Sequence, residues 1–213
     1  MSHSETTVVH VVRHGEVFNP DKILYGRLDG YRLSDLGRDM AGVVADYFAD
    51  HDVTTVTASS LQRAQETAAP IAAAHGVTVR TDDRVIEAAN YFEGRPVAMA
   101  TFLHPRSLLQ MYNVARPSWG EPYAEILDRM TQALVAARDL SRGHEAVIVS
   151  HQLPIWTLRS HLEGRRLWHY PSQRECSLAS VTSVTYSGDE VTSVSYAEPA
   201  HHLLARSSKG VGA

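Results

Sequence analysis

The sequence has one cysteine among its 213 residues and no excess of positive charge, with a formal net charge of -4. A lone Cys176 excludes an intramolecular disulfide and a cysteine cluster for a metal, which fits a reducing compartment, and we expect it to be a small apolar residue in a strand. Proteins that bind nucleic acid normally present a basic surface to the phosphate backbone. We therefore expect no nucleic-acid partner, and any anionic ligand must be held by a local pocket.

The sequence also lacks a long hydrophobic run. Residues 1–5 have no cationic start, and the apolar stretch after them ends early, at Arg13, so we expect neither a signal peptide nor a membrane span. The expected location is the cytoplasm. The 12 histidines are scattered, with no His-Glu-x-x-His pattern, and we predict neither a metal nor another cofactor.

The residues that are present fit one globular domain. Hydrophobic residues make up 44% of the chain and charged residues 21%, and 213 residues can bury a sizeable core. We expect a single domain over residues 1–200, followed by a loosely held tail over 201–213. Between 88 and 120 the helical periodicity fails and prolines recur, which predicts an irregular insertion with at most one short helix, long enough to act as a lid.

Strands and helices alternate along the rest of the chain. The predicted strands cover residues 8–12, 53–58, 77–80 and 146–150. The predicted helices cover residues 34–50, 61–75, 122–141 and 153–163. Two alternating segments, 177–186 and 191–196, predict a hairpin at the sheet edge, whose exposed strand would allow a homodimer. This order favours an α/β fold with a parallel sheet and helices on both faces.

Polar side chains recur where these strands end. Arg13 and His14 follow the first strand, Glu87 follows the third, His151 follows the fourth, and Arg63 lies in the first turn of the helix after the second. Because the carboxyl ends of parallel strands share one edge of a sheet, these groups should converge. Arginine offers a planar fork for phosphate, and histidine a nucleophile or base near neutral pH. Taken singly, each could be structural: an exposed helix arginine, a solvated carboxylate or a capped core histidine.

In combination and in this order, the motifs resemble those of the histidine phosphatase superfamily, the phosphoglycerate mutase-like proteins. The resemblance rests on Arg13-His14-Gly15-Glu16, Leu33-Ser34-Asp35-Leu36-Gly37, the run from Ser59 to Ala68, Glu87 with Glu93-Gly94, and Val149-Ser150-His151. It implies a three-layer α/β/α sandwich around a mixed, mostly parallel six-stranded sheet. Its first and fourth strands would lie side by side at the centre.

The resemblance also implies a mechanism. His14 would attack phosphorus as a neutral imidazole and form a phosphohistidine, while Arg13, Arg63 and His151 hold the phosphoryl oxygens. Glu87 would give a proton to the leaving alkoxide and then take one from water. No metal or cofactor takes part in this scheme.

Five further residues are candidates for substrate contact. Gly15 can bring its backbone close to a ligand, because it has no side chain. Asn19 and the pair Gly26-Arg27 are candidates for a phosphate or sugar contact. Gln152 could reach phosphate through its backbone N–H or its side chain.

Water as the acceptor makes a phosphatase the main interpretation, with a small-molecule phosphate ester as its substrate. The closest alternative is a cofactor-dependent phosphoglycerate mutase, which must exclude water. A non-catalytic phospholigand-binding protein is a third. The aromatic and cationic side chains of the insertion suit a sugar phosphate, a nucleotide or a second anionic group, and they equally suit a satellite core.

Overall fold

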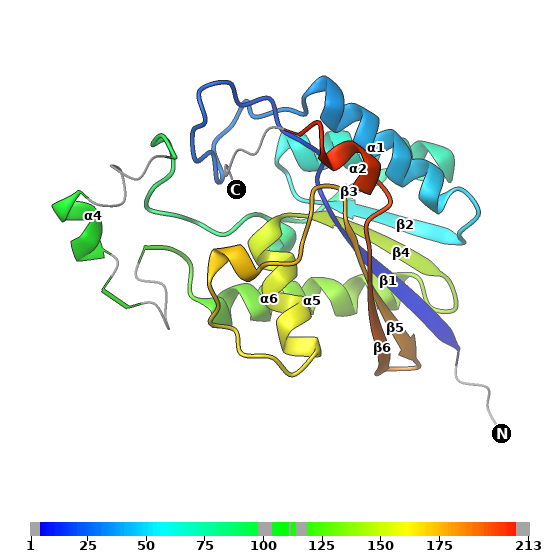
Figure 1. The fold of residues 1–213 in the computed structure, drawn as a ribbon. Helices are drawn as coiled ribbons and strands as arrows, with labels where there is room; N and C mark the ends of the chain where they lie inside the picture. The colour runs from blue at the N-terminus through cyan, green and yellow to red at the C-terminus, as the bar shows by residue number, and fades with distance from the viewer. Residues whose placement is uncertain (1–4, 98–103, 111, 114–118, 208–213) are drawn as a thin grey trace.

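A mixed six-stranded sheet forms the centre of the computed structural model, which describes residues 5–97, 104–110, 112–113 and 119–207 (Figure 1). The strand order is β3-β2-β4-β1-β5-β6. The first four strands in this order run parallel, and the last two continue the sheet in antiparallel pairing. The strands are β1 (Thr6–Arg13), β2 (Val53–Ala58), β3 (Val79–Thr81), β4 (Glu145–Ser150), β5 (Val181–Ser187) and β6 (Glu190–Ala197).

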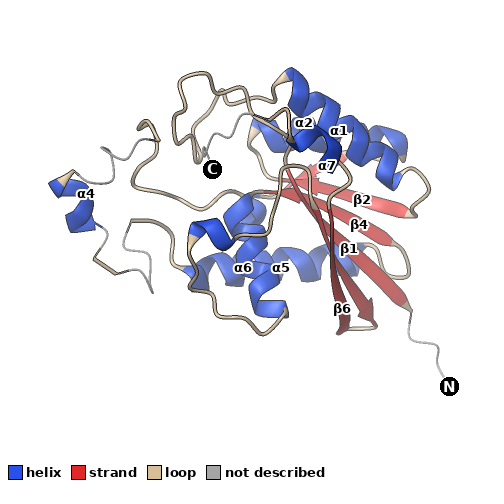
Figure 2. Cartoon of the chain, viewed as in Figure 1, coloured by secondary structure: helices blue, strands red, loops and turns tan. Residues whose placement is uncertain are grey.

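Helices cover both faces of this sheet, so the predicted three-layer α/β/α sandwich is confirmed (Figure 2). One face carries α1 (Asp35–Phe48) and α2 (Gln62–Ala74), and the other carries α5 (Tyr123–Leu140) and α6 (Gln152–Leu162). Single 3₁₀ turns lie at Asp83–Val85 and Pro171–Gln173. Within the described residues, no helix combines the length and apolar character that a membrane span requires.

The central strand β1 is buried on both faces. Val9 and Val11 pack into the core beneath α5 and α6, whereas Val12 packs into the core beneath α1 and α2. Side chains alternate along a strand, so a run of β-branched residues can fill two cores at once. The register pairs Arg13 of β1 with Ser150 of β4, as expected for neighbouring parallel strands. The two strands therefore deliver the residues that follow them, His14 and His151, to the same edge.

The chain before β5 differs from the prediction. The strand was expected from residue 177 but begins at Val181, because the preceding segment turns around Arg13. The carbonyl oxygen of Cys176 accepts a hydrogen bond from Arg13 Nη1 at 2.7 Å, and Ala179 has a φ of 55°. Cys176 is therefore buried in the loop before β5 and not in a strand, so that part of the prediction is wrong.

The insertion and the tail are described in part. Residues 98–103, 111, 114–118 and 208–213 lie outside the described residues. The described part of the insertion holds one short helix, α4 (Pro105–Gln110), which stands away from the sheet and its helices (Figure 1). The tail differs from the prediction at its start, because α7 (His201–Leu204) buries Leu203 in the core beneath α1 and α2. A lid function for the insertion remains a prediction.

The loop after β1 is packed against α1 through two glycines. A Cβ on Gly37 would lie 2.0 Å from the Glu16 carbonyl oxygen, and one on Gly15 would lie 2.5 Å from the Gly37 carbonyl oxygen. Gly42 of the same helix has open space around it. We expect Gly37→Ala to lower the free energy of unfolding by about 2 kcal/mol through overpacking. Gly42→Ala, the matched control, should raise it by up to about 1 kcal/mol through helix propensity. Urea denaturation of both variants measures the difference, and equal effects would contradict this account.

Candidate active site

His14 lies directly after β1 and is fully buried. Its Nδ1 is 2.8 Å from the Gly15 carbonyl oxygen, and because a carbonyl can only accept, Nδ1 carries the proton. The tautomer therefore leaves a lone pair on Nε2. Burial, together with the positive charges of Arg63 and Arg13, holds the pKa of His14 well below its ordinary value. The side chain is a neutral imidazole whose Nε2 can act as a nucleophile.

Two arginines lie beside His14. Arg13 comes from the end of β1 and is held by the Cys176 carbonyl. Arg63 comes from the first turn of α2, is fully buried, and donates from Nη2 to the Gly26 carbonyl oxygen at 2.6 Å. Its guanidinium carbon also lies 4.8 Å from the centre of the Tyr25 ring. Both guanidinium groups are fixed by the protein, which suits a preorganised clamp for an anion.

His151 follows β4 and precedes α6. Its ring centre lies 5.1 Å from that of His14. Its Nε2 is hydrogen bonded to Ser59 Oγ at 2.7 Å, just beyond the end of β2. Burial, followed by the charge of Arg63, holds the pKa of His151 well below its ordinary value. The structure thus brings the two sequence-predicted histidines into contact.

Glu87 approaches the same cluster from the segment after β3 and is buried. One carboxyl oxygen, Oε1, accepts a hydrogen bond from the Ala88 N–H at 2.8 Å. Burial raises the pKa of Glu87, although this hydrogen bond and the charges of Arg63, Arg174 and Arg13 oppose the shift. A carboxyl group with a raised pKa can hold a proton for donation.

Each of these five residues has one buried polar atom without a hydrogen-bond partner among the residues that the structure describes. The atoms are Arg13 Nε, His14 Nε2, Arg63 Nε, Glu87 Oε2 and His151 Nδ1. Buried polar groups are normally paired, and such an exception is common at catalytic sites. The cluster offers donors, a lone pair and a carboxyl group with a raised pKa, which is a set of groups suited to a phosphoryl group and its leaving oxygen.

The other residues that the sequence predicts to contact substrate form contacts within the loops around this cluster. Gly15 packs against α1, and its N–H donates to Thr67 Oγ1. Asn19 Nδ2 donates to the Ile23 carbonyl oxygen at 2.8 Å, and Asn19 Oδ1 accepts from the Ile23 N–H at 3.0 Å. The side chain therefore stabilises its own turn. The Gly26 carbonyl holds Arg63.

Arg27 also acts within the protein. Its Nε donates to the Glu87 carbonyl oxygen at 2.6 Å, and its Nη2 is paired with Glu121 at 2.7 Å. Glu121 in turn binds Arg129, whose Nη1 donates to the Arg84 and Ile86 carbonyls. These contacts hold the backbone that positions the Glu87 carboxyl group. Sequence reasoning missed these contacts, because the residues come from four separate segments.

Arg174 is a further cation at the site that sequence reasoning missed. It lies before β5, donates from Nε to His169 Nε2 at 2.8 Å, and contacts Gln152 Oε1 at 3.4 Å. Its charge acts on Glu87 and on Arg13, so the guanidinium lies near the predicted acid. Gln152, the first residue of α6, thereby links Arg174 to the turn at Cys176. The irregular spacing around Arg174 carries no motif that could have revealed it.

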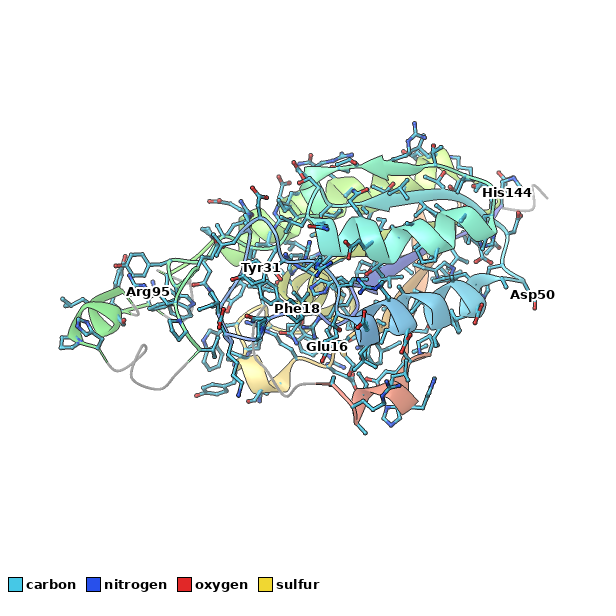
Figure 3. All side chains as sticks on the ribbon, turned by 90° about the horizontal axis from the view of Figure 1, so that it is seen from above. Glu16, Phe18, Tyr31, Asp50, Arg95 and His144 are labelled. Atoms are coloured by element: carbon cyan, nitrogen blue, oxygen red, sulfur yellow. The ribbon has the colours of Figure 1, made fainter. Side chains whose placement is uncertain are left out.

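The loops at this edge lie between the sheet and the insertion. Figure 3 places Glu16, Phe18 and Tyr31 between Arg95 toward one end of the molecule and His144 at the other. Arg95 stacks on the Tyr91 ring at 4.8 Å, and Phe92 is buried beneath them. Phe92 is therefore the buried aromatic residue at the start of the insertion, whereas Tyr91 is exposed.

The sequence matches the model of the histidine phosphatase superfamily (branch 1) over residues 9–199. Among curated relatives, the chain is 57% identical over 198 residues to "Uncharacterized protein Rv0525" of Mycobacterium tuberculosis, covering 92% of this chain and 98% of the relative. It is 34% identical over 184 residues to "Probable phosphoglycerate mutase GpmB" of Yersinia pestis, covering 81% of this chain and 83% of the relative.

The chain is also similar in fold to solved structures. The chain superposes on a mycobacterial glucosyl-3-phosphoglycerate phosphatase, Rv2419c in complex with VO3, with a TM-score of 0.68 and 26% identity. The match covers 83% of this chain and 92% of that one. The match to the family model and the similarity to these proteins both extend over most of the chain.

Proposed function

The chain belongs to the histidine phosphatase superfamily, and we propose that it is a phosphatase that hydrolyses a small-metabolite phosphomonoester through a phosphohistidine on His14. The single observation that carries this proposal is that each of the five residues of the cluster keeps one buried polar atom without a hydrogen-bond partner among the described residues. Two arginines, two histidines and one carboxyl group supply the phosphate clamp, the nucleophile and the acid that such a reaction needs. Relatives named as a phosphatase and as a mutase are consistent with phosphoryl transfer.

In the first step, His14 Nε2 attacks phosphorus and an N–P bond forms. The bond between phosphorus and the ester oxygen breaks, and Glu87 gives its proton to that oxygen, so an alcohol leaves. Arg13, Arg63 and His151 hold the three remaining oxygens, whose charge they stabilise. The neutral state of His14, which follows from its lowered pKa, keeps the attacking lone pair available near neutral pH.

In the second step, water attacks phosphorus and Glu87, now ionised, takes one of its protons. The N–P bond breaks, inorganic phosphate leaves, and both His14 and Glu87 return to their starting states. The chemistry uses side chains of this chain alone. The proposal places the reaction in the cytoplasm, and the edge strand β6 offers the surface through which a homodimer would form.

The charge of Arg174 bears on the class of substrate. We propose that its guanidinium binds a second anionic group, a carboxylate or a further phosphate, of the phosphate ester. Its charge acts on Glu87, the proposed acid for the leaving oxygen, which supports a role for this cation near the leaving group. Fixed cations in a partly dry pocket discriminate strongly between charged and neutral ligand groups.

The test is phosphate release from a panel of metabolite phosphates that differ in whether they carry a second anion. We expect kcat/KM to be highest for the doubly anionic esters. Arg174→Gln should raise KM for those esters about 10-fold or more and leave esters without the second anion nearly unchanged. Arg142→Gln is the control, because Arg142 forms exposed ion pairs with Asp139 and Asp189. Equal losses on both classes of ester would remove Arg174 from this role.

The mutase is the second candidate, favoured by the similarity to a probable phosphoglycerate mutase. The same panel distinguishes the two, if it includes 3-phosphoglycerate with and without 2,3-bisphosphoglycerate. Conversion to the 2-isomer with little free phosphate would make the protein a mutase. Failure to turn over any phosphate ester would favour a non-catalytic phospholigand-binding protein.

A further inference from the structure

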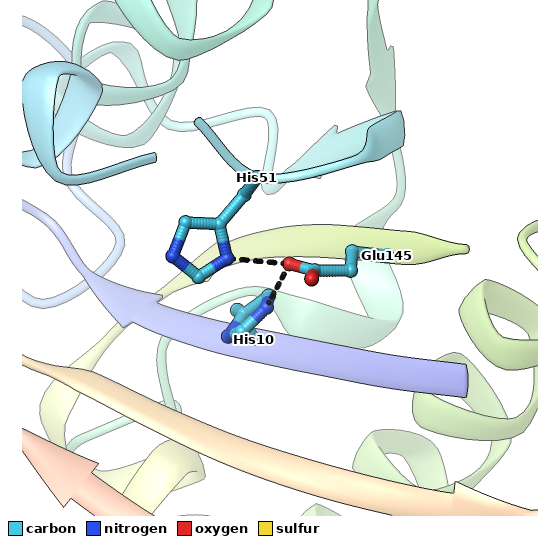
Figure 4. A group of neighbouring side chains, drawn as sticks. All are labelled: His10, His51 and Glu145. Atoms are coloured by element: carbon cyan, nitrogen blue, oxygen red, sulfur yellow. Dashed lines mark hydrogen bonds and ion pairs between the residues drawn. The ribbon is translucent and has the colours of Figure 1, made fainter. Parts of the chain in front are cut away.

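A second cluster of titratable side chains lies away from the proposed active site. His10 of β1, Glu145 at the start of β4 and His51 in the turn before β2 point toward one another (Figure 4). His10 Nε2 lies 2.8 Å and His51 Nδ1 lies 2.6 Å from the same oxygen, Glu145 Oε2. His14, just past the end of β1, lies four positions after His10, which at strand spacing is about 13 Å. The cluster is thus distinct from the phosphoryl clamp.

We propose that His10, His51 and Glu145 form a binding site for a transition-metal ion of the Zn²⁺ type. Two imidazoles and one carboxylate are a ligand set that Zn²⁺ takes in proteins, with a water molecule in the fourth position. The proposal is independent of the proposed phosphatase function. It adds an ion-binding activity at the end of the sheet where the parallel strands begin.

The distances between the ligand atoms suit such an ion. All three atoms lie within 4.8 Å of one another. Metal bonds of about 2.0–2.1 Å in a tetrahedron place ligand atoms about 3.3 Å apart. An ion would move the carboxylate oxygen about 0.5 to 0.7 Å from each nitrogen and draw the two imidazole nitrogens together by up to about 1.5 Å. Rotation of the three side chains would have to supply these movements.

The surroundings hold one ligand in the orientation that a metal requires. His10 Nδ1 is hydrogen bonded to Ser183 Oγ at 2.8 Å, which is the outer contact that commonly orients a metal-binding imidazole. Because Nδ1 is engaged there, the other ring nitrogen, Nε2, points toward Glu145.

The site is open on one side. The His10 side chain is 5% exposed, whereas His51 is 30% and Glu145 23% exposed. An ion and its water can therefore enter past His51. The Glu145 N–H donates to the Asp52 carbonyl at 3.0 Å, so the turn and β4 are already tied together. A bound ion would further join β1, β4 and the turn after α1.

The neighbouring pair His144 and Asp52 provides a matched control. It lies beside the cluster in sequence, its two atoms are 2.6 Å apart, and both side chains are exposed. It contains one imidazole and one carboxylate, one ligand fewer than the proposed site. A histidine that merely attracts ions at the surface would behave like His144.

Calorimetric titration of the full chain with Zn²⁺, after removal of metal by a chelator, tests the proposal. We expect one ion to bind per chain, with Co²⁺ giving the visible absorption of a tetrahedral site. Glu145→Gln and His51→Ala should weaken binding at least about 100-fold, and Ser183→Ala about 10-fold, since it removes only the orienting contact. His144→Gln should bind as the wild type does. Thermal melts without metal establish that each variant is folded.

Three results would overturn the proposal. They are no Zn²⁺ binding by the wild type, binding that Glu145→Gln and His51→Ala leave unchanged, and binding that His144→Gln abolishes. In the first case the three side chains are a hydrogen-bonded clamp only. Because Ser183→Ala leaves all three ligands in place, the proposal stays testable even if a ligand variant does not fold.

Discussion

Replacing His14 with alanine is expected to lower kcat/KM for phosphate release by at least about 10⁴-fold, the scale on which removal of a catalytic nucleophile acts. The Nε2 lone pair is held in place by the bond from Nδ1 to the Gly15 carbonyl, and the clustered cations keep it unprotonated. A steady-state phosphate assay measures the loss.

The control for this variant is His201→Ala, which removes an exposed histidine of α7. It should leave kcat/KM unchanged. Alkaline quench of the wild type during turnover should trap phosphate in a bond to the chain that survives base and is lost in acid, as expected of a phosphohistidine, and His14→Ala should trap none. Activity that survives in His14→Ala, or phosphate trapped on another residue, would contradict the role proposed for His14.

Glu87→Gln is expected to slow the hydrolysis of alkyl phosphates by about 10² to 10⁴-fold, the range for loss of a general acid. An aryl phosphate such as p-nitrophenyl phosphate should lose far less in the first step, because its leaving group hardly needs a proton. The amide keeps the size of the carboxyl group and one acceptor for the Ala88 N–H. Measuring both substrates on one preparation separates acid catalysis from a general disturbance of the site.

The pH profile gives an independent readout of the same role. Glu87 must be protonated to act as the acid, so kcat/KM for an alkyl phosphate should fall as the pH rises through the pKa of Glu87. Burial raises that pKa, which moves the fall above the range of an ordinary carboxyl group. Glu87→Gln should remove this limb. Glu125→Gln, which changes an exposed carboxylate in the first turn of α5, should leave the profile as in the wild type. Equal losses of both substrates with Glu87→Gln would assign Glu87 a structural role.

Strong local patterns predicted most of the fold. The β-branched runs of β1, β2 and β4 and the apolar spacing of α1, α2, α5 and α6 place these elements within a few residues of their observed bounds. Ser34 was predicted to begin α1, and its Oγ accepts the Gly37 N–H at 2.9 Å. The error at the start of β5 has a physical cause. The segment before β5 is held by the hydrogen bond from the Arg13 guanidinium to the Cys176 carbonyl, which is a long-range contact and not a local sequence preference.

The convergence of the five candidate site residues was predicted, but the contacts that support them were not. Arg13, His14, Arg63, Glu87 and His151 each follow a strand or open a helix, so their convergence could be inferred from a parallel sheet. Asn19 was predicted to contact the ligand, yet its amide is used within its own turn. Side-chain pairing of this kind depends on distances across a loop, which a sequence does not contain.

By itself, then, the sequence determined the α/β order of the elements, the two buried central strands and the family motifs, because period and residue type are local properties. Only the tertiary structure decided the tautomer of His14, the raised pKa of Glu87 and the position of Arg174, since each depends on neighbours from distant segments. It also decided the cluster of His10, His51 and Glu145, whose members are up to 135 residues apart. Scattered histidines predicted no metal, and only folding brings two of them to one carboxylate.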